Sequence, residues 1–570
     1  MNSVLMRLGP RARRAVEDRD SGMALVTVLG IGMVMTLLLF AISGFAVNQV
    51  TQVRKDQDWN AALAAAEAGV DDYLSRLAVD GGYWRYGNPS SPYSTGSTLT
   101  LPTGTNANPA FSGWTAIPGA TARGYYRYDV NTTIFTGSNG QGIIKLRASG
   151  KVGTKIRSLE VSVARRGFTD YLYFTEYDTK DPALYDPLYG DPLTSTQAQT
   201  QCAKHRYEGR VDDSSHCVTI QFGGGDTING PLHSNDAFYA CQVTFKGTTT
   251  TSWNDTAKKF YVTPSGCGST PAFTAPLSPA YASPLTMPPS NSSLRQQVDP
   301  TYTTTPGCLY TGPTSVVLNS NGTMNVSSPW TANGGAAYCG VGSNLALPAN
   351  GVLIVQNVPA TPDAYTRATP TTACKNSGAG NPLGYPITND VASYGCKTGD
   401  LFIEGTLKGQ LTAAADNNIY ATWHLTYAGG AGGSDLLGLI ANNYVQVYHP
   451  VKCTTFSGSQ CTAGSNLNAA PNHTTTTFND PSINAAILSL NHSFLVQSYR
   501  WGSALGTLNV TGAIAQKYRG IVALSGTSGY VKNYVYDSKL KYASPPFFLD
   551  PTQSAYGYKT WSEITPAYSS

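Results

Sequence analysis

The stretch Met23–Val47, written MALVTVLGIGMVMTLLLFAISGFAV, contains no charged residue and indicates how the whole chain is organised. As an α-helix it would be about 38 Å long at 1.5 Å per residue. That length crosses a hydrocarbon core of roughly 30 Å with some tilt, whereas a secretory signal has an apolar region of only about 7–15 residues. The stretch therefore predicts a helix that spans a membrane once and is retained.

The charges on either side of this stretch predict its orientation. Downstream lie Arg54 and Lys55, and upstream lie five arginines: Arg7, Arg11, Arg13, Arg14 and Arg19. Because the side richer in Lys and Arg stays in the cytoplasm, the N-terminus is expected inside. We expect a single-pass protein of the cytoplasmic membrane, in contact with membrane lipid, with an extracellular C-terminal body.

The helix is expected to continue beyond the membrane, over residues 23–80. No proline occurs between residues 48 and 78. Apolar residues recur at the three-to-four spacing of one helical face, at Leu63, Ala66, Val70, Tyr73 and Leu77. This outer half is amphipathic and needs a surface on which to pack.

A basic leader over residues 1–22, the apolar helix and a later alanine-rich segment together resemble a type IV prepilin. More narrowly, they resemble minor pilins and pilus-assembly proteins with a PilX-type N-terminal domain. The matching residues are Gly22, Ala24, Leu25, Val26, Ala65, Ala66, Glu67 and Ala68.

The resemblance implies that a prepilin peptidase cuts after Gly22 and that Met23 becomes the methylated N-terminus. It also implies that the helix packs against other pilin subunits and the pilus-assembly machinery. Major pilins carry a glutamate five residues into the mature chain, where this sequence has Thr27. The difference favours a minor pilin, and a plain membrane anchor remains an alternative.

Residues 81–168 are expected to form a small antiparallel sheet that covers the amphipathic helix. Residues 81–120 are rich in Gly, Pro, Ser and Thr and are typical of a loop. Strand-like alternation follows over 125–134, 142–152 and 155–166.

Residues 169–570 are expected to form a large extracellular β-rich domain stapled by disulfides. The chain has 13% charged residues, 58 Gly and 35 Tyr, a composition typical of a turn-rich β protein outside the cell. An even number of cysteines beyond the apolar stretch fits an oxidising compartment, although free thiols remain an alternative. If neighbours along the chain pair, they close five loops. The cysteines are Cys202, Cys217, Cys241, Cys267, Cys308, Cys339, Cys374, Cys396, Cys453 and Cys461.

Weak internal repeats in this region predict a β-solenoid. The strand-like IYATW, YVQVY and SFLVQ follow Asn417-Asn418, Asn442-Asn443 and Asn491-His492 respectively. Short strands at a regular spacing, with asparagines that can stack at the corners, suit coils that stack on one another. A β-sandwich with long loops would have a similar composition, so the expected fold is α+β with a solenoid-like or sandwich-like body.

No motif for catalysis, metal binding or a cofactor is present, so we expect neither an enzyme nor a metalloprotein. The acidic stretch 176–191 could hold calcium, but Asp-Pro turns explain it more simply. Asp416, Asp435 and Asp480 are candidates for a carboxylate pair by residue type alone. The formal net charge of +4 includes no basic stripe, which argues against a nucleic-acid partner.

The sequence thus predicts a minor-pilin-like structural component of a type IV pilus or a related secretion filament. The alternative is a membrane-anchored surface adhesin or carbohydrate-binding β-solenoid that never enters a filament.

Overall fold

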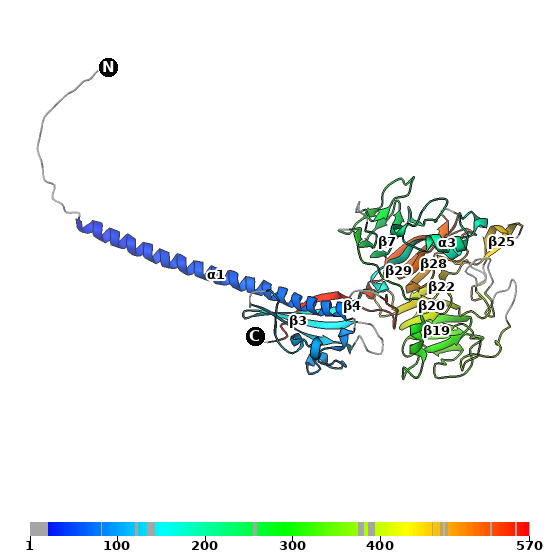
Figure 1. Ribbon diagram of the computed structural model, residues 1–570, viewed down its shortest axis with the longest axis horizontal. Helices are drawn as coiled ribbons and strands as arrows, with labels where there is room; N and C mark the ends of the chain where they lie inside the picture. Colours follow the sequence, from blue (N-terminus) through cyan, green and yellow to red (C-terminus); the bar gives the residue numbers. More distant parts are fainter. Residues whose placement is uncertain are drawn as a thin grey trace, which may run out of the picture.

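The computed structural model describes residues 21–80, 82–119, 123–133, 143–254, 259–276, 278–373, 381–385, 394–458, 460–467, 471–473, 477–524, 527–552 and 556–568. One long helix leads into a small β unit, and a larger β unit lies beyond it (Figure 1). The chain is therefore α+β with a mainly β body, as the sequence predicts.

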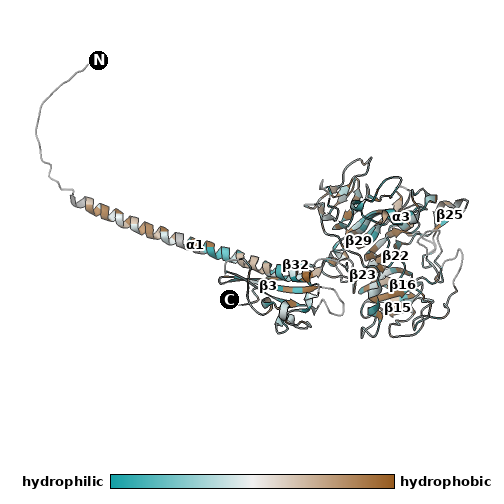
Figure 2. Cartoon of the chain, viewed as in Figure 1, coloured by the Kyte–Doolittle hydropathy of each residue, from teal (hydrophilic) through white to brown (hydrophobic). Residues whose placement is uncertain are grey.

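Helix α1, Ser21–Val79, is 59 residues long and joins the apolar and amphipathic segments without a break. At 1.5 Å per residue it measures about 88 Å. Its first half projects away from both β units and is largely apolar (Figure 2). Ala24–Val79 is the one helical span in the described ranges that is long and apolar enough to cross a membrane.

The smaller β unit is a five-stranded antiparallel sheet. We use the name helix-backed sheet for this sheet and residues 62–77 of α1, which pack on it. Its strands, in spatial order, are β1 (Thr115–Ala116), β2 (Gly124–Asn131), β3 (Ile144–Val152), β4 (Lys155–Arg165) and β32 (Tyr556–Ile564). Val70, Tyr73 and Leu77 of α1 share a core with apolar residues of β2, β3 and β4. The three strands predicted from alternation agree with β2, β3 and β4, and the sheet covers the amphipathic half of α1.

The fifth strand of this sheet comes from the far end of the chain. Strand β32 pairs with β4 from Tyr556 opposite Arg165 to Ile564 opposite Ser158. The sequence-based division placed all of 169–570 in one β-rich domain, so residues 556–564 must be reassigned to the helix-backed sheet. Alternation with period two predicts that a strand forms, but it carries no information about which sheet accepts the strand. The larger unit is thus inserted between β4 and β32.

The larger unit is a parallel β-solenoid, and we use that name for residues 173–536. Its stacked strands are β5 (Tyr173–Lys180), β7 (Thr227–Asn229), β8 (Leu232–Ser234), β10 (Thr244–Phe245), β11 (Thr249–Thr251), β13 (Ala272–Phe273), β14 (Ala280–Tyr281), β15 (Cys308–Thr311), β16 (Thr314–Asn319), β19 (Val352–Gln356), β20 (Leu401–Leu407), β21 (Gln410–Ala415), β22 (Ile419–Tyr427), β23 (Leu436–Ala441), β24 (Val445–Val447), β27 (Ser482–Ser489), β28 (Phe494–Val496), β29 (Ala504–Arg519) and β31 (Ser528–Tyr536). Parallel pairing of one coil with the next excludes the sandwich alternative.

Further elements decorate this stack. A short parallel sheet contains β6 (Gln221–Phe222), β9 (Phe238–Ala240) and β12 (Tyr261–Val262), and antiparallel additions are β17 (Thr323–Ser327), β18 (Gly342–Ala346), β25 (Val451–Ser457), β26 (Gln460–Asn466) and β30 (Ala523–Leu524). One short helix is α3 (Ser195–Cys202), and the 3₁₀ turns are Tyr83–Arg85, Pro92–Ser94, Gly104–Asn106, Pro109–Phe111, Phe168–Asp170, Pro182–Leu184, Pro187–Tyr189, Arg206–Glu208, Ser292–Val298 and Ser538–Lys541.

The repeats seen in the sequence correspond to stacked coils. Ile419 pairs with Val445, which pairs with Phe494, so the three repeated segments lie in register. Asn443 donates a hydrogen bond to the side chain of Asn417 at 2.7 Å, which is the corner stacking that the asparagine pairs predict. The three repeated segments therefore stack apolar residues on one another.

The chain enters the solenoid in the middle of the stack and not at one of its ends. Strand β5 lies between β29 and β8, because Tyr173 pairs with both Ile514 and Leu232. From β5 an outgoing arm, residues 173–281, stacks through β8 and β11 to β14. A returning arm, residues 308–536, stacks from β15 through β19, β21, β23 and β27 to β29. The two arms meet at β5 and β29.

Candidate functional site

The first half of α1 is the largest apolar surface that the described residues expose. The large apolar side chains from Leu25 to Phe45 are between 55 and 78% exposed. Monomeric soluble proteins rarely expose apolar patches larger than a few hundred Å², so a surface of this kind marks a membrane or protein contact. This half of the helix is therefore the first candidate functional surface.

The residues that carry the prepilin resemblance lie at the start of this surface. Residues 1–20 of the leader lie outside the described residues, and Gly22 and Met23 belong to the first turn of α1. Ala24, Leu25, Val26 and Thr27 are exposed, and the Thr27 hydroxyl donates to the carbonyl of Ala24 at 3.3 Å. Processing at Gly22 and methylation of Met23 remain predictions.

The second group of motif residues lies where α1 meets the sheet. Ala65 and Ala66 are buried, Ala68 is half-buried, and Glu67 is exposed. A side chain added at Gly150 of β3 would lie 2.2 Å from the carbonyl oxygen of Ala62 and 2.2 Å from the amide nitrogen of Ala66. The alanines and Gly150 therefore allow the helix backbone to approach β3 closely.

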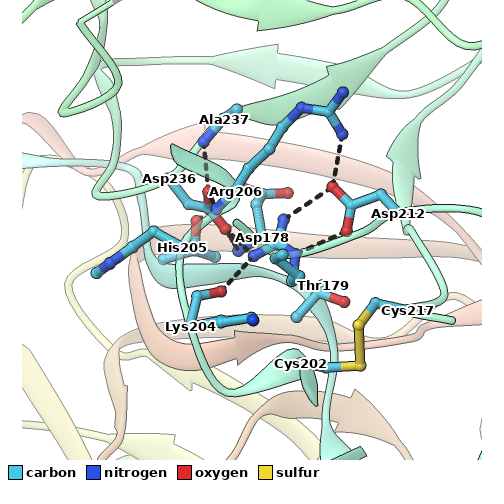
Figure 3. A network of polar contacts seen from close by, with 12 residues as sticks. Asp178, Thr179, Cys202, Lys204, His205, Arg206, Asp212, Cys217, Asp236 and Ala237 are labelled. Atoms are coloured by element: carbon cyan, nitrogen blue, oxygen red, sulfur yellow. Dashed lines mark hydrogen bonds and ion pairs between the residues drawn. A yellow bond between two sulfur atoms is a disulfide. The ribbon is translucent and has the colours of Figure 1, made fainter. Parts of the chain in front are cut away.

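A buried network of alternating charges lies where the two arms of the solenoid meet (Figure 3). Arg519, at the end of β29, donates to Asp178 of β5 at 2.7 Å, and both side chains are 1% exposed. The backbone N–H of Asp178 donates to Asp236 at 3.0 Å, and Arg210 donates both to Asp236 and, at 2.7 Å, to Asp212.

Burial governs the electrostatics of this network. Burial raises the pKa of Asp236, in opposition to the nearby Arg210. Burial also disfavours a charged Arg519, yet the attraction of Asp178 raises the pKa of that guanidinium overall. Because the charges are paired and buried, the network joins the two arms of the solenoid.

The acidic residues singled out in the sequence are dispersed among structural partners. Asp181 accepts from His492 at 2.9 Å, and Asp191 accepts from Lys180 and Arg500. Asp416 pairs with Arg295, while Asp435 and Asp480 accept backbone N–H groups. In the part of the chain that the structure describes, no three His, Cys, Asp or Glu side chains are grouped to hold a metal ion.

Disulfides form between neighbouring cysteines along the chain. The pairs are Cys202–Cys217, Cys241–Cys267, Cys308–Cys339 and Cys453–Cys461. Cys396 is also disulfide-bonded, and Cys374 lies outside the described residues. Cys308 is buried in the solenoid core, whereas Cys453–Cys461 closes the peripheral hairpin β25–β26.

A second candidate site, which sequence reasoning missed, lies on the outside of the solenoid. A cavity of about 130 Å³, partly open to solvent, is lined by residues of the turn at 184–189, of the hairpin β25–β26 and of the segment 498–501. Its walls include Tyr189, Tyr499 and Trp501. The aromatic content of the sequence hinted at such a surface, but these residues come together only because three distant segments meet.

No protein-family model matches the chain, and no curated protein matches its sequence. Among solved structures, the competence-associated pilin ComZ from Thermus thermophilus is similar with a TM-score of 0.26 and 12% identity. The match covers 89% of this chain and 97% of that one. A TM-score of this size does not establish a shared fold.

Proposed function

We propose that this chain is a minor-pilin-like structural component of a type IV pilus or a related secretion filament. The observation that supports this most is the division of α1 into two halves. One half packs on an antiparallel sheet, and the other exposes an uncharged apolar surface with no covering element in the described ranges. Such a surface first lies in the membrane and then packs against the helices of neighbouring pilins.

The remaining steps follow from the flanking residues. The basic leader keeps the N-terminus in the cytoplasm, where a prepilin peptidase cuts after Gly22 and methylates Met23. The solenoid, with its disulfides, is displayed outside the cell. A carboxylate in a membrane helix needs a partner, commonly the amine of a neighbouring subunit, and Thr27 stands where major pilins carry that carboxylate. Without this pairing group, the chain suits a minor position in the filament better than the repeating one. The role is structural and not enzymatic.

N-terminal mass spectrometry of the chain from its own cells tests the processing step. We expect a mature protein that begins at methylated Met23. The variant Gly22→Val should retain Met1. Gly30→Val is the control and should be processed normally, because a Cβ atom added at Gly30 has no other atom within 4 Å. A wild-type chain that keeps Met1, or that is cut beyond residue 40, would contradict the proposal.

Cysteine cross-linking tests the filament contact itself. Val34→Cys and Leu38→Cys place thiols on the exposed half of α1, and both should cross-link to other pilins in sheared filaments. Ala66→Cys, buried against the sheet, is the matched control and should not cross-link. Absence of the chain from sheared filaments, with cross-links to none of the pilins, would overturn the proposal.

A surface adhesin is the second candidate, and the aromatic walls of the cavity favour it. In that case the same helix serves only as an anchor. Deletion of the gene would leave piliation intact and reduce attachment to surfaces, whereas loss of a minor pilin would reduce piliation.

A further inference from the structure

We propose that the cavity outside the solenoid, here called the aromatic cavity, binds one ring of a neutral carbohydrate. The residues that carry this proposal are Asp186, Tyr189, Tyr499, Arg500 and Trp501. The site lies far along the chain from α1, so it does not depend on the filament proposal.

The walls of the aromatic cavity provide flat apolar surfaces at an angle to each other. The rings of Tyr189 and Trp501 lie 5.8 Å apart between centroids with their planes at 71°. Tyr499 is buried, while Tyr189 and Trp501 are partly exposed. Tyr and Trp combine an apolar face with a polar group, which suits a ligand with both C–H faces and hydroxyls.

Arg500, which lines the aromatic cavity, belongs to an ion-pair network. Arg500 donates to Asp191 at 2.8 Å and to the carbonyl of Leu184 at 3.3 Å, and its guanidinium lies 4.8 Å from the centroid of the Tyr189 ring. Lys180 donates to the same Asp191 at 2.5 Å. Arg500 is thereby committed to protein groups and is not available to neutralise an anionic ligand.

The formal charges around the site cancel. Lys180 and Arg500 are two cations, and Asp186 and Asp191 are two anions. An anionic ligand would therefore lose its hydration without gaining an unpaired cation, because Lys180 and Arg500 are both paired with Asp191. This balance favours a neutral ligand over a uronic acid or a phosphate.

Polar groups for hydroxyl recognition face the same space. Asp186 uses Oδ1 to accept the N–H of Leu188 at 3.0 Å, and a carboxylate can accept further hydrogen bonds. The Tyr189 hydroxyl and the Trp501 indole N–H make no hydrogen bond within the described ranges. Aromatic walls with a few polar groups are typical of small-molecule sites, and about 130 Å³ is well below the roughly 300–1,000 Å³ of a drug-sized pocket. The space therefore suits a single ring.

The test uses the full chain in lauryldimethylamine oxide, a detergent without a sugar headgroup. The chain is screened on a printed array of neutral and acidic oligosaccharides, and each hit is titrated by intrinsic tryptophan fluorescence. A proline-rich hexapeptide is titrated in parallel, because a proline ring can also stack on aromatic side chains. We expect at least one neutral oligosaccharide to bind, with acidic sugars and the peptide weaker or silent.

The variants separate binding from folding. Trp501→Ala and Tyr189→Ala should each weaken binding about tenfold or more, and Trp501→Phe, which keeps a ring, should weaken it less. Trp561→Ala and Tyr302→Ala remove exposed aromatic side chains elsewhere and should bind like the wild type. Far-UV circular dichroism should be unchanged throughout.

Three results would overturn the proposal. The first is that no neutral sugar binds at 10 mM. The second is that both alanine variants bind as tightly as the wild type, and the third is that an acidic sugar or the peptide binds more tightly than any neutral sugar. Each is distinguishable from failure of the filament proposal, because processing at Gly22 and presence in sheared filaments are measured separately.

Discussion

The helix-backed sheet and the solenoid differ in the kind of contact that holds each of them together. In the sheet, β3 and β4 are joined by a tight turn in which Val152 pairs with Lys155, and α1 precedes both strands. At the junction of the solenoid arms, the Asp178–Arg519 pair joins residues that are 341 positions apart. The sheet is also closed by a distant contact, because Arg157 of β4 pairs with Glu563 of β32 across 406 positions. Its centre is an apolar core, whereas the centre of the junction between the arms is a buried ion pair.

The difference indicates which interactions stabilise each unit. The sheet is held by close apolar packing of small residues against Gly150, with few buried charges. The junction of the arms is held by buried ion pairs, which tolerate the loss of one partner poorly because an uncompensated charge remains. Changes that affect one unit and spare the other can test this contrast, and hydrogen exchange with peptide-level resolution reports on both.

The largest effect is expected from Arg519→Met. The change leaves Asp178 buried and unpaired, so the free energy of unfolding of the solenoid should fall by about 3–5 kcal/mol. Denaturant titration measures the loss, and exchange protection should fall first in β5 and β29. Arg519→Met combined with Asp178→Asn should recover part of the stability. Arg85→Met, which breaks an exposed ion pair, is the control and should change little.

Gly150→Ala should act on the other unit. The added methyl group would lie 2.2 Å from backbone atoms of α1, so the helix must shift and the sheet loses roughly 3 kcal/mol. Exchange protection should fall in β3 and in residues 62–77 while the solenoid is unaffected. Gly113→Ala has only the Pro109 oxygen nearby, at 3.9 Å, and serves as the matched control. Equal loss of exchange protection in the sheet and in the solenoid would contradict the view that different interactions stabilise the two units.

Protonation of His233 should weaken the solenoid in mild acid and leave the sheet unaffected, because all seven histidines lie at or beyond residue 205. Burial raises the pKa of Asp400 to about 6, which opposes this loss, so the contribution of His233 is measured by comparing variants. Burial lowers the pKa of His233 to about 4, from 6.5 in an unfolded chain. Below pH 6.5 the unfolded state therefore binds more protons, and stability is lost as the pH falls towards 4. At pH 5 the loss from this residue should be about 2 kcal/mol.

His233→Gln isolates this effect. The variant should lose less stability than the wild type between pH 7 and pH 5, as followed by denaturant titration at each pH. His216→Gln changes an exposed histidine and should keep the wild-type pH dependence. An identical pH slope for His233→Gln and the wild type would rule out the buried histidine as the cause.

The smallest effect is expected when the Cys453–Cys461 disulfide is removed by a double change to serine. The hairpin β25–β26 lies outside the stacked coils, so global stability should fall by at most about 2 kcal/mol, with exchange protection lost mainly within the hairpin. The corresponding change at Cys308 and Cys339 removes a link inside the core and should cost more. Broad loss of protection in the hairpin variant would mean that the hairpin supports the stack.

Much of the architecture could be predicted from local patterns. The uncharged run Met23–Val47 and the spacing of Val70, Tyr73 and Leu77 predict α1 and its packed face, because a helix places such residues on one side. Alternation predicts β2, β3 and β4. The spacing of the asparagine pairs predicts stacked coils, and the structure aligns Ile419, Val445 and Phe494 accordingly.

Other features left no local trace. The pairing of strand β32 with β4 is decided by where the solenoid returns the chain, and no local pattern marks it. The start of the solenoid at β5, in its middle, is likewise invisible in the pattern of β5 itself. The aromatic cavity was missed because Tyr189 and Trp501 share no spacing along the chain.

The amino-acid sequence by itself determined the long helix, its apolar half, the short strands and the cysteines available for disulfides, because these depend on side-chain periodicity and on residue type. Only the tertiary structure decided that the solenoid is an insertion in the sheet, that its two arms meet through Asp178 and Arg519, and that three aromatic side chains line a cavity. These features depend on contacts between distant segments, and such contacts form only when the chain has closed on itself.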